Sequence, residues 1–186
     1  NACGVTNTNC RKIRGVLSTP SVIGGSSFAC SSSSGNYSIA PVAGASGYLW
    51  TVSGDASVAG SGTSVTVNFG ASFSSGTLCV KALLPCGYQS AQRCLNITNG
   101  VGSISAINGS FAICPGQSGL VYSVSPVGNA ALYTWTVPNN ITILSGQGTN
   151  SITVSAGAGF TLGNICISAT SSCGVVSVQK CKTISS

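Results

Sequence analysis

The sequence is poor in charge: charged residues make up 4% of its 186 residues, and Asp55 is the one acidic side chain. Histidine and methionine are absent. Paired-carboxylate catalysis, histidine triads and metal sites built from histidine or carboxylate therefore cannot be assembled within this chain. The composition predicts a protein that is not an enzyme, with no catalytic residues, no cofactor and no metal site.

Long apolar runs and dense basic clusters are also missing. No unbroken apolar stretch approaches the ~20 residues that a membrane-spanning helix needs, so no membrane span is expected. The net charge of +6 comes from seven basic residues, of which only Arg11, Lys12 and Arg14 lie close together. Nucleic-acid-binding proteins carry denser Lys/Arg clusters, and no nucleic-acid partner is expected.

Cysteine, in contrast, is abundant. Ten cysteines without a Cys-x-x-Cys pair are typical of disulfides formed in an oxidising compartment, rather than of zinc or redox sites. The sequence therefore predicts an extracellular protein at the cell surface.

Two motifs occur twice, 85 residues apart. Tyr-Leu-Trp-Thr-Val at 48–52 returns as Tyr-Thr-Trp-Thr-Val at 133–137. Tyr-Ser-Ile-Ala-Pro-Val at 37–42 returns as Tyr-Ser-Val-Ser-Pro-Val at 122–127. Self-similarity at a fixed period indicates a tandem repeat.

The cysteines follow the same repeat, with steps of 7 and 8 residues between the last three cysteines of each copy. Cys3 and Cys10 fit the end of an earlier copy, because Cys10 precedes Cys30 by the same 20 residues that separate Cys94 from Cys114. We therefore expect a C-terminal hairpin of a preceding repeat at 1–15, one complete repeat at 16–99 and a second at 100–186. The corresponding cysteines are Cys30, Cys79, Cys86 and Cys94 in the first repeat and Cys114, Cys166, Cys173 and Cys181 in the second.

Within a repeat the apolar residues alternate with a period of two, as at 64–69 and 151–155. Clusters of glycine, asparagine and serine interrupt the chain every eight to twelve residues, and no segment has the apolar stripe and caps of a helix. Each repeat has one tryptophan in a central strand, Trp50 or Trp135, which we interpret as a core residue rather than a platform for sugars. This pattern predicts an all-β protein of tandem immunoglobulin-like β-sandwich repeats.

The cysteine spacing also favours one disulfide pattern. Two cysteines of each repeat lie symmetrically about a Cys-Gly tip, so we expect the hairpin bridges Cys79–Cys94 and Cys166–Cys181. The tip cysteines are then expected to bond within their own repeats, as Cys86–Cys30 and Cys173–Cys114. Four cysteines nevertheless allow three pairings.

The second copy also resembles a known family. It has Cys-Pro-Gly-Gln at 114–117, Gly-Gln-Gly-Thr-Asn-Ser-Ile-Thr-Val at 146–154 and the Cys173-Gly174 tip. These motifs resemble the PKD-like repeats of giant cell-surface adhesins of the Bacteroidota, some of which act in gliding motility. The resemblance implies type IX secretion, a role as stalk or adhesive filament, and neighbouring repeats of the same polypeptide or filament as partners.

The sequence departs from the motif of the better-known PKD domains, which carry Trp-Asp-Phe-Gly-Asp-Gly at the tryptophan strand. At 50–55 and 135–140 it lacks the acids of that motif that a calcium site would use.

The basic residues gather on the hairpins that carry the predicted bridges. The first interpretation is that these residues protect the sheet edges, because lysine or arginine on an outer strand discourages pairing between edges. The second is a contact surface for anionic polysaccharide, in which weak contacts repeated along the chain add avidity. The residues proposed for that contact are Arg11, Lys12, Arg93, Lys180 and Lys182.

Three functions are possible for such a chain. The composition and the repeats favour a non-catalytic structural repeat of a long extracellular filament or adhesin, serving as stalk and attachment surface. The alternatives are a carbohydrate-binding accessory module of a secreted enzyme and a catalytic domain. A glycan-binding module should expose several aromatic rings on one face, and the tyrosines not assigned to the core, Tyr37, Tyr48 and Tyr88, offer few of them.

Overall fold

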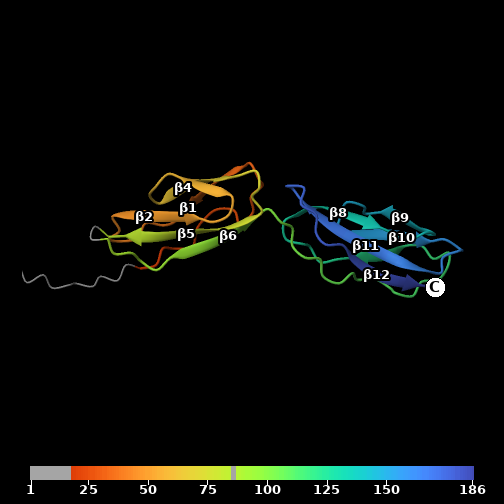
Figure 1. Cartoon of the computed structure of the whole chain (residues 1–186). Helices are drawn as coiled ribbons and strands as arrows, with labels where there is room; N and C mark the ends of the chain where they lie inside the picture. The colour runs from red at the N-terminus through yellow and green to blue at the C-terminus, as the bar shows by residue number, and fades with distance from the viewer. Residues whose placement is uncertain (1–17, 85–86) are drawn as a thin grey trace, which may run out of the picture.

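The computed structural model describes residues 18–84 and 87–186. These residues form an all-β protein without helices, folded as two β-sandwiches that follow one another along the long axis of the molecule (Figure 1). The predicted fold class, tandem immunoglobulin-like β-sandwich repeats, is confirmed. The predicted hairpin at 1–15, with Cys3, Cys10, Arg11 and Lys12, lies outside the described residues, as does Cys86.

The first repeat is built from two three-stranded sheets with the orders β1-β4-β3 and β2-β5-β6. All strand pairs in both sheets are antiparallel. The strands are β1 (Ser34–Ser38), β2 (Gly47–Val52), β3 (Ala56–Ala59), β4 (Ser64–Phe69), β5 (Ser75–Leu83) and β6 (Arg93–Thr98).

The second repeat copies this arrangement, with the sheets β7-β10-β9 and β8-β11-β12. The equality of the two topologies follows from the repeated sequence, since the same alternation of apolar residues closes the same core twice. The strands are β7 (Leu120–Ser123), β8 (Ala130–Thr136), β9 (Ile141–Ser145), β10 (Ser151–Ala156), β11 (Leu162–Ser171) and β12 (Lys180–Ser185).

Each repeat begins with a lead segment, residues 18–30 or 103–114, that crosses from one sheet to the other. In the first repeat it forms an antiparallel bridge from Gly24 to Ser38 of β1 and then a parallel bridge from Phe28 to Thr98 of β6. The second repeat has the corresponding bridges Asn108–Ser123 and Ala112–Ser185. The lead segment thus ends beside the last residues of the last strand.

The cores explain the period of two. On β4 and β10 every second side chain is buried, among them Val67 and Val154 with no exposed surface. Trp50 and Trp135 are also buried, and each indole N–H donates to a backbone carbonyl at 2.8 Å, of Gly62 and Thr149 respectively. Both tryptophans are therefore core residues, as predicted.

A tyrosine packs on a glycine of the lead segment in both repeats. Gly109 has a φ of +134°, and a Cβ added there would lie 2.4 Å from the Tyr122 ring; Gly25 stands in the same relation to Tyr37. The Tyr122 hydroxyl donates to the Ser110 carbonyl at 2.8 Å. Glycine is thus required here both for the backbone conformation and for the space that the ring occupies.

These tyrosines predict a loss of stability at alkaline pH. Burial raises the pKa of Tyr37 and of Tyr122 above the ordinary value of 10.0. Above about pH 10 the unfolded chain loses these phenolic protons while the folded chain keeps them, so the free energy of unfolding should be constant below that pH and fall above it. Urea midpoints measured from pH 8 to 11 test this.

The matched variants are Tyr122→Phe, which should reduce the alkaline decline to the part that Tyr37 causes, and Tyr88→Phe, at a tyrosine that is 62% exposed, as the control. An equal decline in both variants would contradict the assignment to the buried ring.

No helix of the described residues has the length and apolar character to cross a membrane.

Candidate functional site

A disulfide staples the last two strands of each repeat. Cys79 and Cys94 face each other in the register of β5 and β6 with their Cα atoms 4.1 Å apart, and Cys166 and Cys181 do so on β11 and β12 at 4.0 Å. Both hairpin bridges expected from the spacing are present. They attach an edge strand, β6 or β12, to the centre of its sheet.

Loss of a hairpin bridge should destabilise its repeat. Such a bridge closes a loop of about 16 residues, for which the chain-entropy model gives about 3 kcal/mol. The variant Cys166→Ser with Cys181→Ser should therefore unfold its second repeat at a lower urea concentration, with the free energy of unfolding reduced by about 2 to 3 kcal/mol. An unchanged midpoint in oxidising buffer would show that the bridge does not contribute.

The third disulfide corrects a prediction. Cys30 of the first repeat bonds to Cys173 of the second, with an S–S distance of 2.05 Å, a Cα–Cα distance of 5.2 Å and a sequence separation of 143. The predicted bonds within each repeat, Cys86–Cys30 and Cys173–Cys114, are therefore wrong. Cys114 is exposed and is bonded to no described cysteine.

The geometry of the lead segment explains this error. Ala29 donates its N–H to Thr98 O at 3.1 Å, so Cys30 lies where β6 ends, and Thr98 pairs with Ser75 at the start of β5. Leu83 lies at the opposite end of β5, roughly 27 Å away at about 3.4 Å per residue. Since bridged Cα atoms lie within about 7 Å, Cys30 bonds across the junction rather than along its own repeat.

The junction is also fixed by hydrogen bonds on the side of the first repeat. The Asn99 side-chain amide donates to Phe73 O at 2.7 Å, and its backbone N–H donates to Ser74 O at 3.0 Å. Ser31, next to Cys30, donates its hydroxyl to the same Phe73 carbonyl at 2.9 Å. The beginning of the linker is therefore part of the first repeat.

The second repeat holds the same linker from its own side. The Ser171 hydroxyl donates to Asn99 O at 3.2 Å and accepts the backbone N–H groups of Cys173 and Val175, each at 3.3 Å. Ser171 is 4% exposed, so its hydroxyl is shielded from water, whereas Ser172 and Gly174 of the turn are exposed. One serine thus positions the bridging cysteine and contacts the linker.

The end of the linker is equally constrained. Asn129 donates its side-chain amide to Gly100 O at 3.2 Å, and Gly102 N–H donates to Gly128 O at 2.9 Å. A Cβ on Gly102 would come within 3.2 Å of Val127, so glycine permits this close approach. The two sandwiches are therefore connected in two ways, by the Cys30–Cys173 disulfide and by the hydrogen bonds of the linker.

Among the described residues, Arg93 lies on the edge strand β6 and Lys180 and Lys182 lie on the edge strand β12, whereas Lys81 lies on the central strand β5. Two of the edge-strand side chains are bonded to their own repeat. The Arg93 Nε donates to Pro20 O at 3.2 Å, and the Lys182 ammonium donates to Ile107 O at 3.3 Å. Lys180 is exposed and pairs in register with Ile167 as Arg93 does with Val80. The contact of these residues with an anionic surface stays a prediction.

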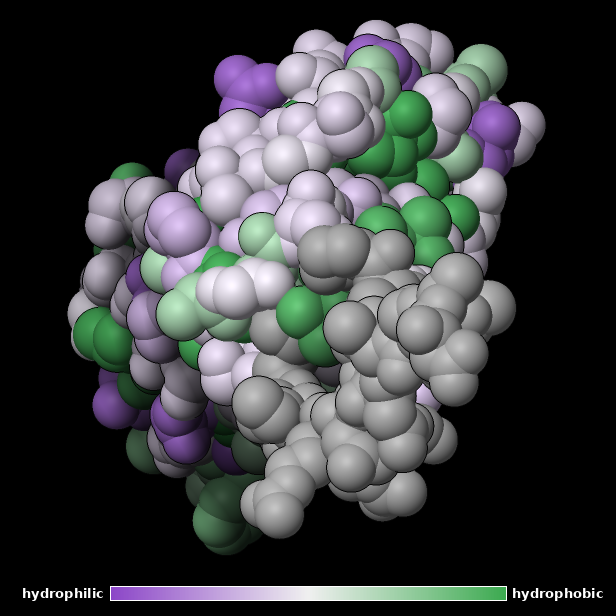
Figure 2. Space-filling view, turned by 90° about the vertical axis from the view of Figure 1, so that its left-hand side faces the viewer, coloured by the Kyte–Doolittle hydropathy of each residue, from purple (hydrophilic) through white to green (hydrophobic). Residues whose placement is uncertain are grey.

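Viewed along the long axis from the first repeat, the described surface shows many pale, weakly polar residues, separate strongly hydrophilic ones and several hydrophobic groups (Figure 2). Within residues 18–84 and 87–186, no three histidine, cysteine, aspartate or glutamate side chains lie close enough to hold a metal ion.

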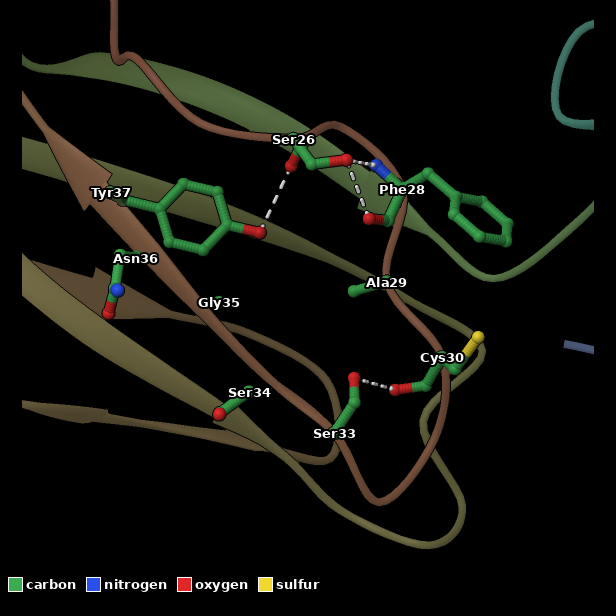
Figure 3. Close-up of a pocket in the computed structure, with 9 residues that line it drawn as sticks. All are labelled: Ser26, Phe28, Ala29, Cys30, Ser33, Ser34, Gly35, Asn36 and Tyr37. Carbon is green, nitrogen blue, oxygen red and sulfur yellow. Dashed lines mark hydrogen bonds between the residues drawn. The ribbon is translucent and has the colours of Figure 1, made fainter. Parts of the chain in front are cut away.

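A pocket of about 310 Å³ lies beside Cys30, where the lead segment separates from β1 (Figure 3). Hydroxyl, amide and apolar groups line it, without any charged side chain. Tyr37 is 2% exposed and donates its hydroxyl to Ser26 O at 3.0 Å, while the Phe28 ring and the Cys30 sulfur point away from Tyr37. The buried Tyr37 therefore offers this pocket no exposed ring face on which a sugar could stack.

The profile of the PKD-like domain matches the sequence twice, at residues 16–97 and 101–183. The chain belongs to the PKD-like domain family. The junction described above thus connects two PKD-like repeats. Among curated proteins, none matches the sequence.

Solved structures align with this pair of PKD-like repeats over most of its length, at low identity. The D00-D0 domain of intimin is 10% identical, with 89% of this chain and 100% of that chain covered and a TM-score of 0.34. The fibronectin(III)-like modules of Clostridium thermocellum CbhA are 12% identical, covering 88% of this chain and 93% of that chain, with a TM-score of 0.36. The Bacteroides ovatus protein SGBP-B, solved with a mixed-linkage heptasaccharide, is 13% identical over 91% of this chain and 45% of its own length, with a TM-score of 0.30.

Proposed function

We propose that this chain is a non-catalytic structural segment of a long extracellular filament or adhesin, in which PKD-like repeats joined end to end form a stalk. The observation that carries the proposal is the junction, where the Cys30–Cys173 disulfide and hydrogen bonds to Asn99 hold two repeats in line. A stalk needs resistance to bending and to separation, and a junction held by a covalent bond and by hydrogen bonds provides both.

The proposal includes the setting. Three disulfides among the described residues agree with an oxidising, extracellular environment. The resemblance to giant Bacteroidota adhesins supports display at the cell surface, type IX secretion and a part in gliding motility. Neighbouring repeats are then the principal partners, and the edge-strand residues Arg93, Lys180 and Lys182 are the proposed contact with anionic surface polysaccharide.

The disulfides define how tension would pass through the molecule. The lead segment of the first repeat runs to Cys30 at the junction, and the bridge continues to Cys173. From there β12 runs away from the junction and ends beside Ala112 at the far end of the second repeat. Force applied at the two ends therefore follows the lead segment, the bridge and β12, and bypasses most of both cores.

This path predicts a short extension under force. In the oxidised chain the junction bridge withholds from stretching the segment from Cys30 to Cys173, a sequence separation of 143. In a variant without this bridge, only the two hairpin bridges shorten the stretched chain, each by a sequence separation of 15. At about 3.5 Å per residue, the variant with both Cys30→Ser and Cys173→Ser should extend roughly 400 Å further when pulled from its ends. Single-molecule force spectroscopy in oxidising buffer measures this difference.

The control is the variant Cys114→Ser, which leaves all three observed bridges in place and should extend like the unchanged chain. If the double variant and the unchanged chain reach the same length, the bridge does not carry the tension, and the proposal of a covalently coupled stalk fails.

A further inference from the structure

At its far end, the second repeat has the same backbone contacts that the first repeat has at the junction. Ser186 N–H donates to Thr161 O at 2.8 Å, as Asn99 N–H donates to Ser74 O at 3.0 Å. The lead segment meets the last strand through Ala112 and Ser185. The equivalence of the two repeats therefore extends to the backbone contacts of this end.

Cys114 occupies at this end the position that Cys30 occupies at the junction. Each follows the residue that bonds to the end of the last strand: Ala29 donates to Thr98 O at 3.1 Å, and Ile113 donates to Ser185 O at 2.9 Å. Cys30 is half-buried and bonded to the second repeat, whereas Cys114 is exposed and bonded to no described cysteine. Phe111, in the same lead segment, is 71% exposed.

The group that bonds to Cys30 identifies the ligand for Cys114. It is a cysteine at a Cys-Gly tip, Cys173-Gly174, whose backbone is fixed by Ser171. The Cys-Gly pair recurs with the period of the sequence, as at Cys86-Gly87. We propose that Cys114 is a coupling site that forms a disulfide with the Cys-Gly tip of a further PKD-like repeat, so that each repeat is bonded to the next. This inference rests on the proposed function and adds to it that disulfide bonds join successive repeats.

The coupling reaction is an oxidation by thiol–disulfide exchange. The Cys114 thiol and the tip thiol together lose two protons and two electrons as their S–S bond forms. A disulfide oxidant of the glutathione class is cleaved to two thiols and takes up those protons and electrons. Thiol–disulfide exchange needs an accessible sulfur, and Cys114 is exposed.

A second copy of the full chain serves as the probe. Purified chain is equilibrated with reduced and oxidised glutathione, and the products are separated on non-reducing gels and mapped by mass spectrometry. We expect covalent dimers and longer species in which the Cys114 peptide is linked to a peptide with a Cys-Gly pair. Cys114→Ser should remove these species and leave the denaturation midpoint unchanged.

Two results would overturn the inference: Cys114 linked only to Cys114 of another copy, or Cys114 found only as a thiol or a glutathione adduct. The failure of the inference is distinguishable from failure of the proposed stalk. If the oxidised chain still shows the shortened extension that the Cys30–Cys173 bridge imposes, the stalk proposal stands and only coupling through Cys114 falls.

Discussion

Replacing Cys173 with serine is expected to lower the free energy of unfolding of each repeat by about 2 to 4 kcal/mol. While one repeat stays folded, the bridge and the linker hold both ends of the other. An unfolded first repeat would be a closed loop of roughly 70 residues, from Cys30 to Gly102, for which the chain-entropy model gives about 4 kcal/mol at most. The same holds for the second repeat, whose unfolded chain would be closed between the linker and Cys173.

Urea denaturation in oxidising buffer measures this effect. Cys30→Ser, Cys173→Ser and the double variant should show the same loss, because all three remove one shared bond and their effects do not add. Cys114→Ser, at the equivalent and exposed position, should stay within about 0.5 kcal/mol of the unchanged chain. Equal stability of Cys173→Ser and Cys114→Ser would contradict a stabilising role of the junction bridge.

The parts of the fold that depend on local pattern could be predicted from the sequence. Alternation of apolar residues specifies which face of a strand is buried, and the duplicated motifs around Trp50 and Trp135 indicate that one topology is used twice. The hairpin bridges follow from symmetry about a tip, since cysteines equally distant from a turn meet across two antiparallel strands. These features require only the spacing of residues within one repeat.

The junction could not be predicted in this way. A periodic sequence makes Cys86 and Cys173 equivalent, so spacing alone does not say whether Cys30 meets the tip of its own repeat or that of the next. The deciding contact is the parallel bridge between Phe28 and Thr98, which brings the end of the lead segment to the linker. This pairing joins residues far apart in sequence, and no local pattern specifies it.

The partners of the basic residues were missed for a related reason. The position of Arg93 and Lys182 on edge strands agrees with the edge-protection interpretation, but their acceptors are backbone carbonyls, of Pro20 and Ile107. Every residue has a carbonyl, so side-chain identity carries no signal for such a contact. The lead segment had to be placed along the edge strand before these hydrogen bonds could be found.

Replacing Trp135 with alanine is expected to lower the free energy of unfolding of the second repeat by about 3 to 5 kcal/mol. The indole is 2% exposed, packs in the core between the two sheets and is the donor to Thr149 O at 2.8 Å. Its removal leaves a cavity and an acceptor without its donor. The backbone of Trp135 keeps its two hydrogen bonds with the Gln147 side chain, so the strand itself should remain in place.

The repeat architecture supplies an internal reference for this experiment. In the Trp135→Ala variant Trp50 is the remaining tryptophan, and its fluorescence reports the unfolding of the first repeat while circular dichroism reports both. The transition of the second repeat should move to lower urea and separate from the fluorescence transition, because the lost packing belongs to the second core alone. Thr134→Ala, an exposed neighbour on β8, should cost about 1 kcal/mol or less. If Trp135→Ala and Thr134→Ala shift the second transition equally, the indole does not hold this core together.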